Sequence, residues 1–229
     1  MTPPKQPPLT LDEILARLNA LADPRNVEGQ RRFGIRPAHQ LGISMPALRG
    51  LAKGRQRSHD LALQLWATRI HEARILASLV DDPQSITREQ MEAWVQDFDS
   101  WDVCDQVCMN LFGEHPLGLE MARTWPHRPE EFVRRAGFVL MAVQAVHRRD
   151  LPDQSFQNYF PLMLEYANDE RNFVRKAINW ALRQIGKRNA ALCQGAIQTA
   201  QQMLAIESPS ARWIARDALR ELEKPERIR

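Results

Sequence analysis

Cysteine is scarce in this chain of 229 residues. Only Cys104, Cys108 and Cys193 are present, an odd set that contains no CxxC pair. Small secreted domains that depend on disulfides carry a denser and usually even set, so the composition argues against a disulfide framework. The three thiols fit a reducing compartment, where we expect them to be buried as small hydrophobic side chains.

Long apolar runs are also lacking. The longest, such as residues 137–146, are broken well short of the roughly 20 residues that span a bilayer. No charged segment followed by an apolar one opens the chain. These absences predict a cytoplasmic protein that has no membrane partner.

Several motifs of enzyme chemistry are missing. The chain has no P-loop, no GxGxxG and no GxSxG element, so nucleotide-driven and serine-hydrolase chemistry have no support. Cys104 and Cys108 are four residues apart, but no histidine pair at metal-ligand spacing accompanies them, and His71-Glu72 lacks the second histidine of a zinc protease. We therefore expect no metal and no cofactor.

Lysine is rare, with 5 Lys against 26 Arg, and the net charge of +3 is unevenly distributed. Residues 171–229 carry 12 Lys or Arg against 5 Asp or Glu, a net of +7, whereas residues 1–170 carry 19 against 23, a net of −4. Arg presents a planar fork that fits phosphate oxygens, so the basic end is a candidate for binding a polyanion. Charge alone leaves a solvated, arginine-rich helical surface equally open.

No segment alternates with period two between turn signals, so we predict no sheet and an all-α fold. Prolines at 3, 4, 7 and 8 predict a loose tail over residues 1–9. Capping boxes at Thr10-Glu13 and Thr87-Gln90, and the Ser208-Pro209 start, precede apolar residues at helical spacing. The predicted helices cover 11–22, 45–51, 59–80, 88–98, 101–113, 117–123, 130–146, 154–167, 172–186, 190–205 and 209–222.

The connections are short, and the helices form successive antiparallel pairs of about 35 to 40 residues, the period of HEAT-type arrays. Two segments, 131–138 and 172–180, also place Phe, Val and Arg at matching offsets. We therefore predict that residues 10–229 form a single domain of HEAT-like (ARM-type) repeats. Such a curved superhelical solenoid has a concave face that can follow an extended ligand such as a DNA duplex.

The most unusual segment is 97–105, which places four carboxylates around a tryptophan at a helix start. Capping and the helix dipole explain Asp99, Ser100 and Asp102. They explain Asp105 poorly, because it lies in the second turn, four residues after Trp101 and on the same face. Asp105 is therefore a candidate functional carboxylate.

Two further segments combine basic and aromatic residues. Arg134 and Arg135 lie among apolar neighbours, so at least one must reach a partner, and an ion pair with an acidic neighbour is the simpler interpretation. Around Trp180, basic residues recur at helical spacing, a pattern typical of nucleic-acid contacts. Taken alone, Trp180 is more often a core residue. The same holds for Trp66, Trp94, Trp125 and Trp213.

Four segments together resemble a known family, the HEAT-like repeat alkylpurine DNA glycosylases, also called DNA alkylation repair proteins. They are Trp101-Asp-Val-Cys-Asp105, Phe132-Val-Arg-Arg135-Ala, Asn172-Phe-Val-Arg-Lys-Ala-Ile-Asn-Trp180-Ala-Leu-Arg and Ala211-Arg-Trp-Ile-Ala-Arg-Asp-Ala-Leu. Each segment is weak evidence, but the set is specific, and the resemblance runs from about Phe33 to Leu222.

The resemblance implies which residues act. In that family a Trp, an Asp four residues on, an Arg in a following helix and a second Trp line the cleft, and these match Trp101, Asp105, Arg135 and Trp180. Phe33 matches a tyrosine that contributes near the N-terminal part. We expect Trp101, Asp105 and Arg135 to be catalytic. The expected DNA-binding residues are Trp180, Phe33, Arg175, Lys176, Arg183, Lys187 and Arg212.

The chemistry implied is hydrolysis of the N-glycosidic bond of N3- or N7-alkylated purines in double-stranded DNA. The alkylated base already carries positive charge, so the enzyme must mainly stabilise the charge that develops on the sugar. Asp105 would stabilise it and orient the water, the two tryptophans would contact the cation with their π faces, and Arg135 would hold a phosphate. The resemblance also implies that the base is not flipped into a deep pocket and that the strand is not cleaved. We expect a monomer.

Two alternatives remain open. Some members of such a family bind branched or distorted DNA without catalysis, and the basic C-terminal third and the Phe33 replacement fit that function too. A protein-binding HEAT scaffold, in which the Trp and Arg residues serve packing and a peptide groove, predicts no salt-dependent DNA binding.

Overall fold

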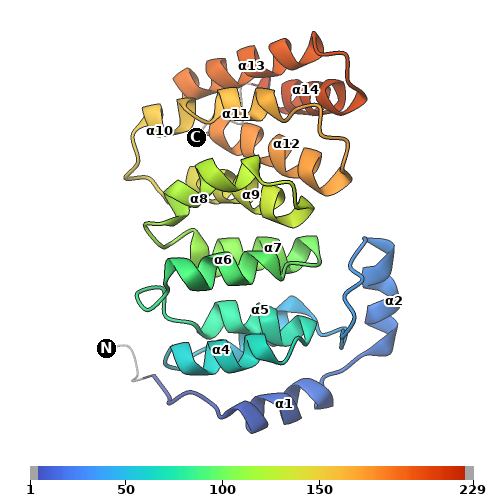
Figure 1. The fold of residues 1–229 in the computed structure, drawn as a ribbon, viewed down its shortest axis with the longest axis vertical. Coiled ribbons are helices and arrows are strands. Elements are labelled where there is room, and N and C mark those ends of the chain that lie inside the picture. Colours follow the sequence, from blue (N-terminus) through green and yellow to red (C-terminus); the bar gives the residue numbers. More distant parts are fainter. Residues whose placement is uncertain (1–4, 225–229) are drawn as a thin grey trace. The chain divides into compact units, whose positions relative to one another are not determined.

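The computed structural model describes residues 5–224, and within them helices are the only extended secondary structure (Figure 1). The all-α prediction is confirmed. Contacts divide the chain into two compact units, Met1–His115 and Pro116–Arg229, and each is described by itself. The single domain over residues 10–229 therefore stays a prediction.

The first unit is built around α5. This helix packs against α3, α4 and α7, and its residues 71–78 are all buried. Beside it, the rings of Trp66 and Trp94 stack with centroids 4.0 Å apart. In Figure 1 the helix α2 stands apart from the stacked helices of this unit. The helices are α1 (Leu11–Ala20), α2 (Pro24–Arg32), α3 (Met45–Ala52), α4 (His59–Ala67), α5 (His71–Val80), α6 (Arg88–Gln96), α7 (Trp101–Val107) and the π-helix η1 (Cys108–Phe112).

The second unit is built around α12. This helix packs on α9 on one side and on α14 on the other, while α13 covers α11, α12 and α14 (Figure 1). Gly137 allows α9 to lie directly on Pro126, since a Cβ there would come 2.4 Å from the proline Cδ. The helices are α8 (Gly118–Thr124), the 3-10 turn η2 (Trp125–His127), α9 (Glu131–His147), α10 (Asp153–Gln157), α11 (Phe160–Glu165), α12 (Asn172–Gly186), α13 (Ala190–Leu204) and α14 (Pro209–Leu222).

Side-chain caps start the helices where the sequence predicts them. Thr10 accepts a hydrogen bond from the Glu13 amide and completes a capping box. Thr87 and Ser208 also accept from the amides of Gln90 and Ala211, each the third residue of its helix. The capping box predicted at Thr87-Gln90 is not completed, because the Gln90 side chain donates to Asp81 instead. Such caps satisfy amides that the helix itself leaves unpaired, which is why these starts are readable from the sequence.

Two predicted helices are each divided in the structure, and one helix lies where none is predicted. The helix predicted over 59–80 is two helices, because Arg69 adopts φ 57° and the Thr68 hydroxyl accepts from the Ile70 amide. The helix predicted over 154–167 breaks between α10 and α11, where Pro161 lies in the first turn of α11. The helix α2 was not predicted. Asp23-Pro24 reads as a stop, but Asp23 caps α2 and Pro24 is its first residue.

The segment before α1 differs from the loose tail that its prolines predict. Residues 1–4 lie outside the described residues. Gln6, however, forms a parallel bridge to the chain after α3, with its amide 2.9 Å from the Gly54 carbonyl and its carbonyl 2.8 Å from the Gln56 amide. Leu9 is buried. The prolines leave the Gln6 amide and carbonyl available, and the Pro7 carbonyl also accepts from the Arg55 guanidinium at 3.3 Å, so the segment is docked on the chain after α3.

All three cysteines are buried, as expected, and burial raises the pKa of the Cys193 thiol. Within residues 5–224, no helix has both the length and the apolar character needed to cross a membrane.

Candidate nucleic-acid interface

The four residues expected to form one site divide between the two units. Trp101 and Asp105 lie on α7 in the first unit. Arg135 lies on α9 and Trp180 on α12 in the second. Each pair is therefore described within its own unit, and their union in one cleft stays a prediction.

Polar side chains of α5 fix the segment that leads into α7. Arg74 is 5% exposed and donates to the Asp97 carbonyl at 2.8 Å and to the Asp99 carboxylate. His71 is 1% exposed, and its Nε2 donates to Asp102 Oδ2 at 2.8 Å. Because both partners are buried on a core helix, the start of α7, and with it Trp101, is held rigidly.

The Asp102 carboxylate is held ionised by this contact. Burial by itself raises the pKa of Asp102, but the hydrogen bond and charge of His71, with hydrogen bonds from Ser100 and the backbone, together outweigh burial, so the pKa lies below its usual value. The sequence attributes Asp99 and Asp102 to helix capping and the helix dipole, but in the structure both carboxylates bond side chains of α5. Asp99 and Asp102 pair with α5, whereas Asp105 lies one turn further on and is 8% exposed.

The indole of Trp101 reaches the end of α2. Its Nε1 donates to the Phe33 carbonyl at 3.0 Å, while the Phe33 ring itself is 74% exposed. Gly34 follows with φ 82°, a conformation that glycine adopts without strain, and the next residue, Ile35, is buried. Trp101 and Phe33 therefore lie together, as the resemblance implies, because the ring nitrogen of Trp101 bonds the backbone carbonyl of Phe33.

A buried carboxylate holds the chain that follows α2. Glu72 is 1% exposed and accepts hydrogen bonds from the amides of Leu41 at 2.9 Å, Gly42 at 2.6 Å and Ile43 at 3.3 Å. Gly42 has φ 77°, and a Cβ on it would lie 2.2 Å from the Asp23 carbonyl. This clamp fixes both ends of the segment that carries Phe33.

A small cavity of about 180 Å³ lies beside Trp101. Its walls are mostly apolar, and its polar edge includes the His71–Asp102 pair. A cavity of about 150 Å³ accepts benzene, so this one has room for one ring-sized group. The lining residues are Gln30, Ile35, Ile43, Met45, His71, Ile75, Trp101, Asp102 and Gln106.

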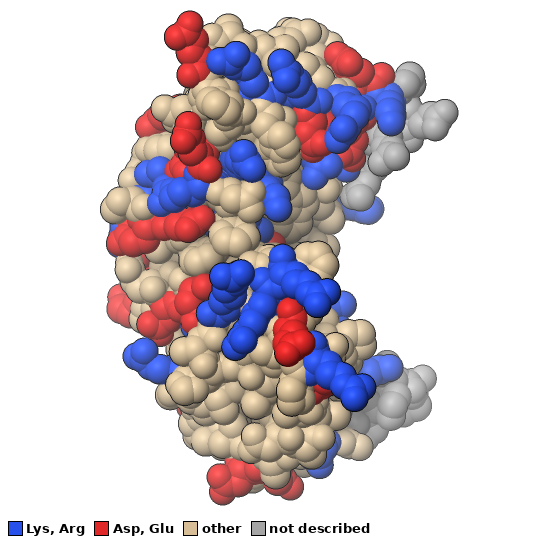
Figure 2. Space-filling view, turned by 90° about the vertical axis from the view of Figure 1, so that its right-hand side faces the viewer, with Lys and Arg blue, Asp and Glu red and all other residues tan. Residues whose placement is uncertain are grey.

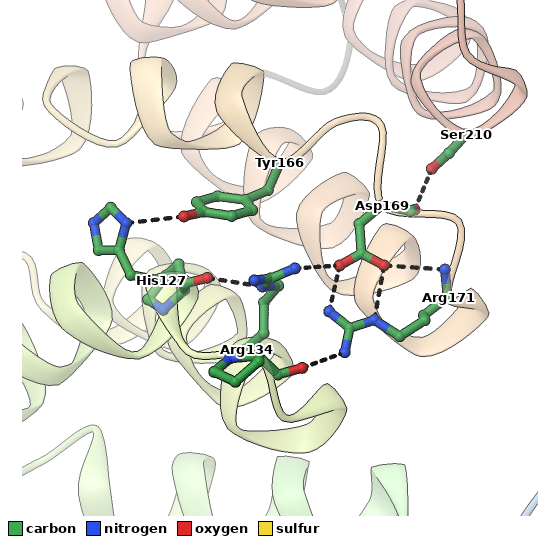
Figure 3. A network of polar contacts seen from close by, with 8 residues as sticks. His127, Arg134, Tyr166, Asp169, Arg171 and Ser210 are labelled. Carbon is green, nitrogen blue, oxygen red and sulfur yellow. Dashed lines mark hydrogen bonds and ion pairs between the residues drawn. The ribbon is translucent and has the colours of Figure 1, made fainter.

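In the second unit, Arg134 and Arg135 have different partners. Arg134 donates to Asp169 at 2.7 Å and to the Pro126 carbonyl at 2.8 Å, and its guanidinium lies 4.5 Å from the Tyr166 ring centre (Figure 3). Burial raises the pKa of Asp169, but the hydrogen bonds from Arg171 and Arg134 outweigh it and lower the pKa. The ion pair expected for one of the two arginines is thus made by Arg134.

Arg135 is 5% exposed, and its guanidinium donates to the Phe173 carbonyl at the start of α12. The neighbouring rings of Phe132 and Phe173 lie 5.7 Å apart. A cation buried in this way is held in one orientation, because any other would leave its donors unsatisfied.

This geometry is matched by a family resemblance over almost the whole chain. The family model described as DNA alkylation repair enzyme matches residues 14–224. The chain belongs to the DNA alkylation repair enzyme family. The prediction from the four sequence segments is confirmed.

The relatives of this family member are distant. An uncharacterised protein of Listeria monocytogenes is 22% identical over 175 residues, which are 75% of this chain and 76% of the relative. One of Listeria innocua is 21% identical over 199 residues, 85% of this chain and 87% of the relative. A solved structure is similar with a TM-score of 0.80 at 17% identity, covering 96% of both chains. That protein is described as one of a new family related to the HEAT-like repeat DNA glycosylases with affinity for branched DNA structures, and the likeness shows the HEAT-like fold.

The basic residues predicted to bind DNA around Trp180 differ in their partners. Arg175 is partly buried, donates to Asn172 and lies 5.1 Å from the Trp213 ring centre. Arg183 and Lys187 both pair with Glu221. Burial raises the pKa of Glu221, but these two cations outweigh burial, so the pKa is lowered. Lys176 and Arg212 are exposed, and neither has an ion pair within residues 5–224.

Trp180 is partly exposed, unlike Trp66, Trp94 and Trp125, whose predicted burial is confirmed. The burial predicted for Trp213 is wrong, because this side chain is 37% exposed.

Sequence reasoning missed the arginines on α2 and just after it. Arg25, Arg31, Arg32 and Arg36 are all exposed, and within the described part of the chain none of them has an ion pair. Figure 2 views the side of the molecule that carries α2 in Figure 1 and shows basic side chains gathered there on the first unit. The signal was the spacing of these arginines around an Asp-Pro helix start. It was overlooked because the whole-chain charge division assigned residues 1–170 a net negative charge.

Among residues 5–224, no group of three or more His, Cys, Asp or Glu side chains is arranged to hold a metal ion.

Proposed function

We propose that this member of the DNA alkylation repair enzyme family is a monofunctional DNA glycosylase. Its substrates are cationic N3- and N7-alkylated purines in double-stranded DNA. The observation that carries the proposal is Asp105, a carboxylate 8% exposed, one helical turn after an indole that the protein holds rigidly. Electrostatic stabilisation is strongest where water is excluded and the charged group is already oriented.

The residues divide the chemistry among them. As the glycosidic bond breaks, positive charge develops on the deoxyribose, and the Asp105 carboxylate stabilises it and orients the attacking water. The base leaves with the electron pair of the C–N bond, which neutralises its positive charge, so no general acid is required. Trp101 and Trp180 present π faces to the cationic nucleotide, and Arg135, fixed by the Phe173 carbonyl, binds an adjacent phosphate.

Base release tests this function. The protein is incubated with duplex DNA that contains N7-methylguanine or N3-methyladenine, and the free base is quantified. We expect release by the wild type and a loss of about a hundredfold or more in Asp105→Asn, the scale of removing one preorganised charge-stabilising group. Asp60→Asn, an exposed carboxylate on α4, is the matched control and should release base like the wild type. Absence of release by the wild type, or normal release by Asp105→Asn, contradicts the proposal.

A second candidate function is binding of branched or distorted DNA without catalysis. The specific observation in its favour is the region of α2, with three exposed arginines on the helix, a fourth, Arg36, just after it, and the 74% exposed Phe33 at its end. An exposed aromatic side chain beside cations can stack on a base pair at the end of a DNA duplex or at a branch point, because one face of that base pair is not covered by a neighbouring pair. Tight binding to a four-way junction without base release selects this function over the first.

We also propose that the protein acts as a monomer in the cytoplasm. Light scattering of the purified protein at micromolar concentration, with and without DNA, tests the first part. A mass near twice the 26.4 kDa of the chain contradicts it.

A further inference from the structure

The last helix, α14, has two opposite faces. Its inner face is apolar and buried through Ala211, Ile214, Ala215, Ala218 and Leu222. Its outer face lines a hollow of about 490 Å³. The residues of the hollow recur every three or four positions along the helix, as a single exposed stripe does: Pro209, Arg212, Trp213, Arg216, Asp217 and Arg220.

Trp213 is the unexpected member of this stripe. It is 37% exposed, although tryptophan is among the side chains that gain most from burial. The Arg175 guanidinium from α12 lies 5.1 Å from its ring centre, and Arg175 is itself hydrogen-bonded to Asn172. The indole is thus held in place while part of it faces the hollow.

The charge of the hollow is positive. Arg212 and Arg216 are exposed, and within residues 5–224 neither has an ion pair. The acidic member, Asp217, is matched by Arg220 and Arg183 and also accepts from the Asn179 amide at 2.8 Å. Residues four apart on a helix are about 6 Å apart along its axis, so Arg212, Arg216 and Arg220 form an evenly spaced row beside the indole.

We propose that this hollow binds an unpaired nucleotide of a DNA strand. The base stacks on Trp213, and Arg212 and Arg216 bind the phosphates on its two sides. Bases inside a duplex have both faces covered by neighbours, so only an unpaired or terminal base can use the indole in this way. An aromatic ring beside a row of cations is the usual combination for single-stranded nucleic acid. The inference rests on the DNA-binding part of the proposed function and adds a site for single-stranded extensions.

The test compares two DNA molecules with the full-length protein. One is a blunt duplex, and the other is the same duplex with a short oligothymidine extension, and affinity is measured by fluorescence anisotropy. We expect the wild type to bind the extended duplex about fivefold or more tightly, the lower end of what one base–aromatic stack provides. Trp213→Ala should remove this preference, and Trp213→Phe should keep most of it. Leu204→Ala, an exposed apolar side chain on α13, is the matched control and should keep the preference in full.

The phosphate contacts have their own readout. Arg212→Ala with Arg216→Ala should reduce the salt dependence of binding to the extended duplex by about 1.4 in log–log slope, or roughly 0.7 for each phosphate of a single strand. Arg149→Ala, an exposed arginine after α9, should leave the slope unchanged. Circular dichroism and thermal unfolding verify that each variant is folded.

Three results overturn the inference. The first is a wild type that binds both DNA molecules equally, and the second is an unchanged preference in folded Trp213→Ala. If polyglutamate competes as well as oligothymidine for the wild type, the hollow is a site for acidic protein and the inference also fails. Base release by the wild type from blunt alkylated duplex is scored separately. A protein that releases base without preferring extensions refutes only this inference, and one that prefers extensions without releasing base refutes only the glycosylase.

Discussion

At the scale of single residues, the carboxylates before and within α7 have the same chemistry but different surroundings. Asp99 and Asp102 are paired with Arg74 and His71 from α5. Asp105, one turn later on the same helix and 8% exposed, is the carboxylate to which the proposed chemistry is assigned. The His71–Asp102 pair therefore positions Trp101 and Asp105, and it touches neither base nor sugar in the mechanism proposed.

The pH dependence of stability tests this pair. The pKa of Asp102 is lowered in the folded protein, so the ionised carboxylate stabilises the fold above its unfolded value near 3.9, and this contribution is lost as pH falls through the lowered pKa. Asp102→Asn should reduce the free energy of unfolding at pH 7 by about 1 to 3 kcal/mol, the range for a buried hydrogen bond to a charged group. Urea unfolding at pH 7 and below pH 4 should show the difference from wild type shrinking in acid.

The control is Asp12→Asn, which changes an exposed carboxylate of α1. It should change stability by less than about 0.5 kcal/mol at either pH. A difference between wild type and Asp102→Asn that stays constant down to pH 3 would mean that the His71 contact does not hold the carboxylate ionised.

At the scale of elements, two glycines within helices have opposite surroundings. Gly137 of α9 lies against Pro126, so a Cβ would meet Pro126 Cδ at 2.4 Å. Gly29 of α2 has nothing within 4 Å of the place where its Cβ would be. Their intrinsic cost to a helix is similar, and only packing distinguishes them.

Gly137→Ala should lower stability by about 1 to 3 kcal/mol, because a proline ring on a packed turn cannot move away from the new methyl group. Gly29→Ala should raise it by about 0.5 to 1 kcal/mol, because alanine favours the helix and has space there. Thermal and urea unfolding measure both. Equal effects in the two variants would contradict the close contact between α9 and η2.

At the scale of the whole molecule, each unit has its own exposed cations, on α2 in the first and on α14 in the second. If both sets of cations contact the same DNA, their contributions to binding can be measured separately. The slope of log K against log salt depends on the number of phosphates that the protein neutralises, so removing either set lowers the slope by its own share.

Arg31→Ala with Arg32→Ala should lower the slope of log K against log salt for duplex binding by about 1.8, since each phosphate contact contributes roughly 0.9. The same pair combined with Lys176→Ala on α12 should lower it by about 0.9 more. Anisotropy titrations between 50 and 200 mM salt, about the range over which such slopes are measured, give the values. A slope unaffected by the α2 variants would place the DNA on the second unit alone.

Much of this molecule was determined by sequence that is local along the chain. Helices α12 and α14 were both predicted with their observed bounds, α12 from its apolar periodicity and α14 from its apolar periodicity and the Ser208 cap, because these signals act over a few neighbouring residues. The helix α2 and the breaks at Arg69 and Asn158 were missed, since Asp-Pro can end one helix and begin another, and a single backbone conformation decides whether a helix continues.

Only the tertiary structure decided which charged side chains are neutralised. Arg183 and Lys187 looked like DNA contacts beside Trp180, yet Glu221, more than thirty residues later, pairs with both. The exposed arginines at 25, 31, 32 and 36 and at 212 and 216 keep their charge available because, within residues 5–224, packing places no carboxylate in an ion pair with them. The sign of a residue's charge is fixed by its type, whereas its availability to a phosphate depends on which distant side chain the fold places beside it.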